Sequence, residues 1–425
     1  MPLFLLFTVE MWERFSYYGM RALLIFYLTK QWIDGGLALD PQSANLIYGL
    51  FTGLVYFTPL IGGWIADNYI GQRKSISIGA FLMMMGQFAL ASSQSFFALY
   101  LGLTLLILGN GFFKPNISVL VGQLYEHDRS KLDSAFTIFY MGINLGALFA
   151  PLVTGFLAMK YNYNVGFFSA GIGLLIGQII YHSFSKKLLG DIGSKPKEKN
   201  NCKQTSTKEN LTDKEKQHTA VIFIITFFVI FFFAGFEQAG SSFSLFTDEQ
   251  VDRVVGGFEI PSAWFQSVNP LFIVLLAPLL SFLWKYLSGK DKEPSIPAKM
   301  ATGMILLGGG FVLMFFAAQS IEGSEWQKAS LLWVVFAYLL HTIGELCLSP
   351  IGLSMVSQLS PPRLASLLMG VWFLSSFVAN LLAGYVASLV SSVGPMDIFL
   401  MIALVSIVLG LILFALTPKL KKMME

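Results

Sequence analysis

Charged and hydroxyl-bearing side chains are concentrated in one short segment near the start of an otherwise apolar run. Residues 10–21 read EMWERFSYYGMR, with two glutamates and two arginines. If this segment is helical, its polar side chains share one arc of roughly 140°; they are Glu10, Glu13, Arg14, Tyr17, Tyr18 and Arg21. The opposite side holds Trp12, Phe15 and Gly19. A guanidinium can bind a carboxylate ligand through both oxygens, and carboxylates beside it can exchange protons.

The composition of the chain favours a membrane protein. Hydrophobic residues make up 55% of the 425 residues and charged residues 12%, which is about half the charged share of a soluble domain. Within a bilayer, a polar stripe must face a protein interior or a water-filled cavity, because charge is costly there. The alternative for residues 10–21, a salt-bridged helix on a soluble surface, is disfavoured by their apolar flanks.

Twelve apolar runs are long enough to cross a bilayer, which takes about 20 residues each. The first six lie at 3–30, 43–66, 75–93, 96–121, 133–158 and 164–185. The second six lie at 219–246, 262–287, 298–318, 329–357, 364–392 and 395–417. We therefore predict an all-α integral membrane protein with twelve transmembrane helices in two six-helix bundles, residues 1–185 and 219–425, joined by a polar linker at 186–218.

The distribution of basic residues predicts the orientation of the chain. If the chain crosses the membrane at each predicted span, 21 of the 28 Lys and Arg residues lie on the same side of the membrane as the N-terminus, and 4 lie on the opposite side. Because positive charge collects on the cytoplasmic side, we predict that both termini are cytoplasmic and that the chain spans the cell (inner) membrane. The first apolar run lacks the basic start and cleavage site of a signal peptide, so we expect it to be retained.

Charge and cysteine content limit the possible partners. A net charge of only +3 does not indicate a nucleic-acid-binding protein. The two cysteines lie in different settings, Cys202 in the polar linker and Cys347 within an apolar run, so no disulfide is expected.

Two six-helix halves joined by a cytoplasmic linker are the plan of the major facilitator superfamily, in which the halves rock about a site at the bilayer midplane. The segment GGWIADNYIGQRK at 62–74 resembles the signature loop of that superfamily. Asp67 closes a helix, Gly71 provides a turn, and Arg73 with Lys74 forms a basic pair. The resemblance implies a structural role at the cytoplasmic helix ends, and a plain helix-ending turn remains the alternative.

Motifs along nearly the whole chain resemble those of one family, the proton-coupled oligopeptide transporters. They occur at 10–19 (EMWERFSYYG), 109–116 (GNGFFKPN), 139–146 (FYMGINLG), 236–242 (FEQAGSS), 344–350 (GELCLSP) and 369–373 (MGVWF). Two features depart from the family. The segment between the halves is too short and too polar for the extra helix pair of many bacterial members, and the usual hydrophilic N-terminal tail is missing, so we expect a trimmed start.

A peptide substrate, which this resemblance implies, is a zwitterion that needs a cation for its carboxylate and an anion for its amine. We predict that Arg14 with Lys114 binds the carboxylate and that Glu345 binds the amine. Hydrogen-bonding wall residues are predicted at Tyr17, Tyr18, Tyr56, Asn144, Trp372 and Ser376. Helix packing is the alternative role for the aromatic members of this set.

Two pairs of opposite charges are predicted to act as gates. At 1.5 Å per residue, Arg21 and Glu237 lie in the outer half of the membrane. Lys114 and Glu345 lie in the inner half. Because the helices of each pair hold equivalent positions in the two halves, salt bridges Arg21–Glu237 and Lys114–Glu345 would close opposite ends in alternation, and the resemblance implies the same gates. Static buried ion pairs are the alternative.

The deep charges also predict coupling to protons. The spans contain four deep acids and three deep bases, so one carboxylate lacks a full basic partner. A proton is the natural counter-charge for such a group. The predicted coupling residues are Glu10, Glu13 and Glu237. His341 lies nearer the outer surface, and we expect it to be incidental.

We therefore predict a monomeric symporter that moves di- and tripeptides with protons by alternating access, driven by the proton gradient and without a cofactor or metal. Another small-solute transporter of the same fold, either a drug–proton antiporter or a nitrate-type anion transporter, is the alternative. An integral-membrane enzyme is disfavoured because the four His and two Cys are scattered. A receptor-like binding protein would not need two complementary gate pairs.

Overall fold

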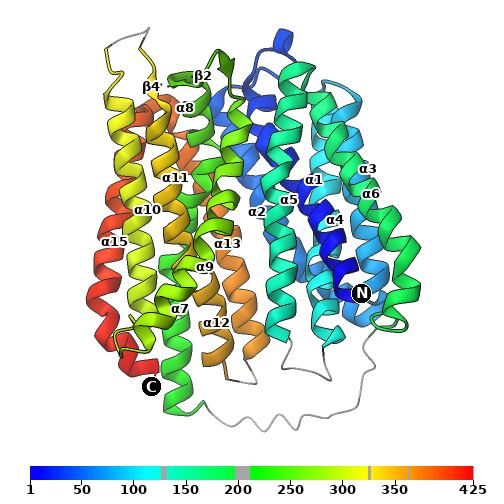
Figure 1. The fold of residues 1–425 in the computed structure, drawn as a ribbon, viewed down its shortest axis with the longest axis vertical. Coiled ribbons are helices and arrows are strands. Elements are labelled where there is room, and N and C mark those ends of the chain that lie inside the picture. Colours follow the sequence, from blue (N-terminus) through cyan, green and yellow to red (C-terminus); the bar gives the residue numbers. More distant parts are fainter. Residues whose placement is uncertain (126–131, 197–210, 324–326, 362–363, 425) are drawn as a thin grey trace. The chain divides into compact units, whose positions relative to one another are not determined.

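The computed structural model of the chain is almost entirely helical (Figure 1). It describes residues 1–125, 132–196, 211–323, 327–361 and 364–424. The chain divides into two compact units: Met1–Asn201 with Glu259–Pro270, and Cys202–Phe258 with Leu271–Glu425. The sequence-based division into two bundles and a linker stays a prediction, and Cys202 lies outside the described residues.

The first unit contains six long helices. They are α1 (Pro2–Thr29), α2 (Pro41–Ile65), α3 (Gln72–Ser92), α4 (Phe96–Leu124), α5 (Leu132–Lys160) and α6 (Tyr163–Leu189). The short 3-10 helices η1 (Trp32–Asp34) and η5 (Ser262–Ser267) also belong to it, and α2 continues into the π-helical turn η2 (Ala66–Ile70). The start of α2 is capped by Asp40, whose carboxylate accepts a hydrogen bond from the Ser43 N–H at 2.9 Å.

The second unit is built from helices of more varied length. They are α7 (Asp213–Phe236), η4 (Glu237–Gly240), α8 (Ser242–Gln250), α9 (Val268–Ser288), α10 (Ile296–Gln319), α11 (Leu331–Leu346), α12 (Ser349–Leu359), α13 (Ala365–Ser388), α14 (Val390–Val393) and α15 (Pro395–Met424). Four two-residue strands pair as β1 (Val251–Asp252) with β4 (Ala329–Ser330) and as β2 (Val254–Val255) with β3 (Phe258–Glu259). A capping box between Thr212 and Glu215 starts α7 six residues before the predicted span.

The described chain has eleven helical segments that are long and apolar enough to cross a membrane. α1 is 28 residues long and carries four charged residues in its sequence. Together with α1, these segments account for the twelve predicted spans. The predicted all-α membrane class is confirmed.

Four of the runs that the sequence predicted as single helices are interrupted in the structure: 219–246, 262–287, 329–357 and 364–392. The interruptions in 219–246 and 329–357 lie beside predicted site residues. In the run 219–246, α7 gives way to η4 at Glu237–Gly240 before α8 begins. In the run 329–357, α11 ends at Leu346, because Pro350 has no N–H to donate to the Leu346 carbonyl. Breaks of this kind within a membrane free backbone groups and often mark binding sites in transporters.

Pairs of glycines bring α3 and α4 into backbone contact. A Cβ on Gly79 would lie 2.6 Å from the carbonyl oxygen of Gly109, and a Cβ on Gly109 would lie 2.5 Å from that of Gly79. Gly86 and Gly102 meet in the same reciprocal way, at 2.8 and 2.9 Å. Small residues allow this approach in membrane helices. α4, which carries Lys114, is therefore fixed to α3.

Candidate functional site

Glycines of α6 receive the apolar side of α1. A Cβ on Gly173 would lie 2.7 Å from the Phe15 ring, and one on Gly177 would lie 3.2 Å from Trp12 Cβ. The apolar side predicted for the segment around Trp12 and Phe15 is thereby confirmed. Because this side of α1 packs on α6, the charged side of α1 faces away from α6.

α5 contacts α1 just as closely. A Cβ on Gly146, in the FYMGINLG motif, would lie 2.4 Å from the Met11 carbonyl oxygen and 2.9 Å from Arg14 Cβ. One turn and a half further along α1, the Thr154 hydroxyl donates to the Gly19 carbonyl at 3.1 Å. Gly146 of this motif therefore allows the backbone of α1 to pack directly against α5, next to Arg14.

The centre of the site is a buried cluster on α1 formed by Glu10, Glu13 and Arg14, which we call the α1 charge cluster. Arg14 Nε lies 2.5 Å from Glu13 Oε2 and 3.0 Å from Glu10 Oε1. The three residues are only 1–4% exposed. The guanidinium also lies 5.5 Å from the centre of the Tyr17 ring, a cation–π distance. The sequence prediction that these side chains share one face is confirmed.

Polar atoms of the α1 charge cluster are left with bonding capacity. Among the described residues, Glu10 Oε2, Glu13 Oε1 and Arg14 Nη2 are buried without a hydrogen-bond partner. Leaving a buried polar atom unsatisfied costs about 1–3 kcal/mol, and more if it is charged. The cluster thus presents one guanidinium donor and two carboxylate acceptors that a ligand or a proton could fill.

A second cation of the first unit lies on an aromatic ring. Lys114 Nζ of α4 is 4.1 Å from the centre of the Tyr56 ring of α2. The Lys114 charge also acts on Glu10 and Glu13. The structure therefore brings Lys114, Tyr56 and the α1 charge cluster into one electrostatic neighbourhood.

Arg21 lies two turns beyond Arg14 on α1. Its Nε donates to the Tyr48 hydroxyl at 2.7 Å, and its guanidinium is 5.9 Å from the centre of that ring. Tyr48 was not among the predicted site residues, although it precedes Tyr56 by eight positions and therefore lies near it on one face of α2.

The remaining predicted site residues of the first unit lie on α1 and α5. Asn144 is buried, and its Nδ2 donates to the Tyr140 carbonyl at 2.9 Å. The rings of Tyr17 and Tyr18 form an edge contact with centres 5.3 Å apart. Tyr17 is buried and Tyr18 is half-buried.

In the second unit, both predicted acids lie next to helix breaks. Glu237 is buried at the end of α7, where η4 begins. Glu345 is half-buried in the last turn of α11, just before the break that precedes α12. The predicted salt bridges to Arg21 and Lys114 join residues of different units, and they stay predictions.

Trp372 and Ser376 of α13 differ in their surroundings. A Cβ on Gly352 of α12 would meet the Trp372 ring, so this indole packs directly over the glycine. Packing, the alternative weighed for the aromatic residues, describes this contact. Ser376 is half-buried, and its carbonyl accepts from Asn380 Nδ2 at 2.8 Å.

His341 is enclosed by apolar side chains of the second unit. Its ring centre lies 4.7 Å from that of Phe311, and a Cβ on Gly310 would meet the imidazole. Within the part of the chain that the structure describes, His, Cys, Asp and Glu form no group of three that could hold a metal ion.

Asn110 is a candidate that sequence reasoning missed. It is 1% exposed, and in the described part of the structure neither its Oδ1 nor its Nδ2 has a hydrogen-bond partner. Its position four residues before Lys114, within the GNGFFKPN motif, was the available signal, because residues four apart share a helix face.

Comparison with known proteins agrees with this architecture. The model of the POT family (PTR2) matches residues 73–197 and 183–401. The chain is 38% identical to the uncharacterized transporter YclF of Bacillus subtilis, with 100% of this chain and 94% of that protein covered. It is 36% identical to the peptide transporter YePEPT of Yersinia enterocolitica, with 91% and 87% covered.

A solved structure is similar over the same length. The crystal structure of a POT family transporter in complex with a thioalcohol-conjugated peptide shares 30% identity and a TM-score of 0.91, with 98% of this chain and 96% of that chain covered. These likenesses define a multi-pass membrane protein of a transporter class rather than an enzyme class. The chain belongs to the POT family.

Proposed function

We propose that this chain carries di- and tripeptides together with protons across the cytoplasmic membrane. The named substrate of the Yersinia relative and the peptide in the compared crystal structure support the substrate class. The observation that carries the proposal is the α1 charge cluster, in which Arg14 Nη2 is a buried donor without a partner among the described residues. A peptide carboxylate offers the planar, two-oxygen acceptor that a guanidinium prefers.

Charge balance supports proton coupling at the same cluster. With both carboxylates ionised, Glu10 and Glu13 carry two negative charges, which the positive charges of Arg14 and Lys114 acting on them balance. A peptide carboxylate adds one more negative charge to this buried and balanced group. Since an unbalanced buried charge is strongly unfavourable, one proton on a glutamate restores neutrality. Peptide and proton binding then favour each other.

The acids of the second unit complete the proposal. Glu345 reads the peptide amine, and alternation of the Arg21–Glu237 and Lys114–Glu345 bridges opens the site to one side of the membrane at a time. The helix breaks beside Glu237 and Glu345 support this role, because a broken helix can change direction at the break while its segments stay intact. We further propose that the chain acts as a monomer with both termini in the cytoplasm.

The test is uptake of a dialanine-type substrate by the purified full chain in liposomes, with the pH lower outside. We expect accumulation that a proton ionophore abolishes. Uptake of nitrate and efflux of cationic drugs are measured in parallel to test the two alternative transporter types. Accumulation of nitrate, or drug efflux exchanged for protons, with no uptake of dipeptide would overturn the proposal.

A further inference from the structure

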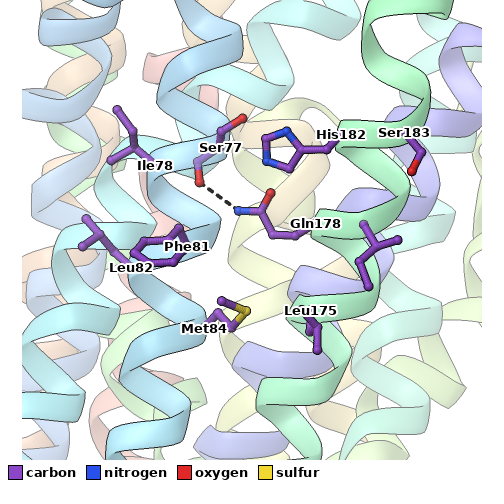
Figure 2. A pocket seen from close by; sticks show the side chains of 10 residues that line it. Ser77, Ile78, Phe81, Leu82, Met84, Leu175, Gln178, His182 and Ser183 are labelled. Atoms are coloured by element: carbon purple, nitrogen blue, oxygen red, sulfur yellow. Dashed lines mark hydrogen bonds between the residues drawn. The ribbon is translucent and has the colours of Figure 1, made fainter.

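A groove of about 640 Å³ runs between α3 and α6 of the first unit (Figure 2). It is lined by Ser77, Ile78, Phe81, Leu82, Met84, Leu175, Gln178, Ile179, His182 and Ser183. Several of its large apolar side chains are more than 40% exposed: Ile78, Phe81 and Ile179. In a membrane bundle, exposed side chains of this kind contact lipid tails.

The groove is polar at one end only. Figure 2 shows Ser77, His182 and Ser183 toward one end, and Met84 and Leu175 at the other. Ser77 lies near the start of α3, and His182 and Ser183 lie near the end of α6, so the polar end of the groove is at this end of the two antiparallel helices. A hydrogen bond from Arg73 Nη1 to the Gly190 carbonyl joins the two segments there. The groove thus has the polarity of a lipid, with a head region and a tail region.

Gln178 joins the two helices of the groove. Its Nε2 donates to the Ser77 carbonyl at 2.8 Å, which fixes the orientation of the amide, since a carbonyl can only accept. The other amide atom, Oε1, is buried and has no hydrogen-bond partner within the described ranges. Figure 2 shows it on the side of His182. Gln178 is only 8% exposed and its Oε1 is buried, so the amide holds α6 to α3 below the surface of the groove.

Two lysines stand over the polar end. At 100° per residue, Lys74 falls within about 15° of the mean direction of the α3 groove residues, and Lys186 falls within about 15° of that of the α6 residues. Both are exposed. They are three and four residues from Ser77 and His182, which is about one helical turn. Lys187 has the same charge at the same helix end, but it points about 110° away.

We propose that this groove binds one phosphatidylglycerol molecule. The phosphodiester lies between Lys74 and Lys186, because a basic pocket between helices attracts an anionic headgroup. An acyl chain lies along Phe81 and the apolar end of the groove. A phosphatidylcholine headgroup has no net negative charge for the two lysines, so it fits less well.

Native mass spectrometry of the full chain in detergent, titrated with phosphatidylglycerol, tests the proposal. We expect one tightly held lipid per chain, no comparable adduct with phosphatidylcholine, and no displacement by inorganic phosphate. The double substitution Lys74→Gln with Lys186→Gln should weaken binding roughly 30-fold, from about 1 kcal/mol for each lysine. The control, Lys187→Gln with Lys160→Gln, removes the same charge. Lys187 points away from the groove, and Lys160 lies just before the start of α6, at the opposite end of that helix, so the affinity should change little.

A third variant tests the apolar part of the site. Leu175→Trp fills the tail end without changing charge and should also reduce lipid binding, while an unchanged unfolding temperature shows that the fold is intact. Equal affinity in the lysine double variant and its control would overturn the proposal, since binding would then be unspecific attraction to basic residues. Equal binding of the two lipids would overturn it, and so would a stable dimer that excludes lipid.

Discussion

The α1 charge cluster makes a sharp prediction for Glu10→Gln and Glu13→Gln. Each substitution removes one negative charge and keeps a side chain of nearly the same shape. The group formed with Arg14 and Lys114 is then already neutral when a peptide carboxylate binds, so no proton is required. Both variants should bind and exchange peptide but fail to concentrate it.

The size of the effect follows from the proton gradient and from the contacts. One pH unit contributes about 1.4 kcal/mol per proton, which corresponds to tenfold accumulation of peptide. In the glutamine variants this ratio should fall to one. A glutamine oxygen at position 13 can still accept from Arg14 Nε, which now lies 2.5 Å from Glu13 Oε2. Only the charge-assisted part of that hydrogen bond is lost, so peptide affinity in exchange should change by no more than about tenfold.

The assay compares gradient-driven uptake with counterflow in the same liposomes for each variant. Counterflow exchanges internal for external peptide and needs no net proton movement. Glu322→Gln, at an exposed position, is the matched control and should behave as the unmodified chain. If both cluster variants still concentrate peptide, the reasoning is refuted and Glu237 becomes the next candidate. Loss of both activities together would show structural damage, which an unfolding measurement detects.

Three further outcomes are expected. Arg14→Lys keeps the charge but loses the planar fork, so the KM for dialanine should rise at least about tenfold with folding preserved; unchanged uptake would remove Arg14 from the site. If Glu345 binds the amine, N-acetylated dipeptides should compete poorly with free ones, and equal competition would show that the amine is not read. A hydrogen bond from Lys299 lowers the pKa of Glu293, so the stabilisation by Glu293 is complete above its ordinary value of 4.5 and is lost as the pH falls through the lowered pKa. Glu293→Gln should therefore lower the free energy of unfolding at pH 7 by less than about 1 kcal/mol, because the carboxylate is partly exposed. A difference between the two proteins that grows on acidification would contradict this.

The spans and the charged face of α1 could be predicted from the sequence because both depend on local patterns. Hydrophobic length alone defines a span, and the 100° repeat alone places Glu10, Glu13 and Arg14 on one face. Trp12 and Phe15 fall on the other face for the same reason, and the structure packs them on α6.

The helix breaks and several side-chain partners could not be read from the same patterns. Apolar runs continue through Glu237 and Leu346, so hydropathy shows no interruption there, although Pro350 was a usable signal. The contact of Trp372 with Gly352 depends on how α12 and α13 pack. Helix periodicity does not specify which residues of two neighbouring helices face each other. Only the structure shows this, for example at the facing glycines of α3 and α4.

The glycine contacts between α3 and α4 have a consequence for the variation that the chain can tolerate. Gly79 and Gly86 are seven positions apart, as are Gly102 and Gly109, and each meets the backbone of the facing helix. A saturation library over these two helices should therefore show depleted variants at positions 79 and 86 of α3 and at positions 102 and 109 of α4. Even alanine should be depleted there, whereas the lipid-exposed Phe81 between them should accept most apolar residues.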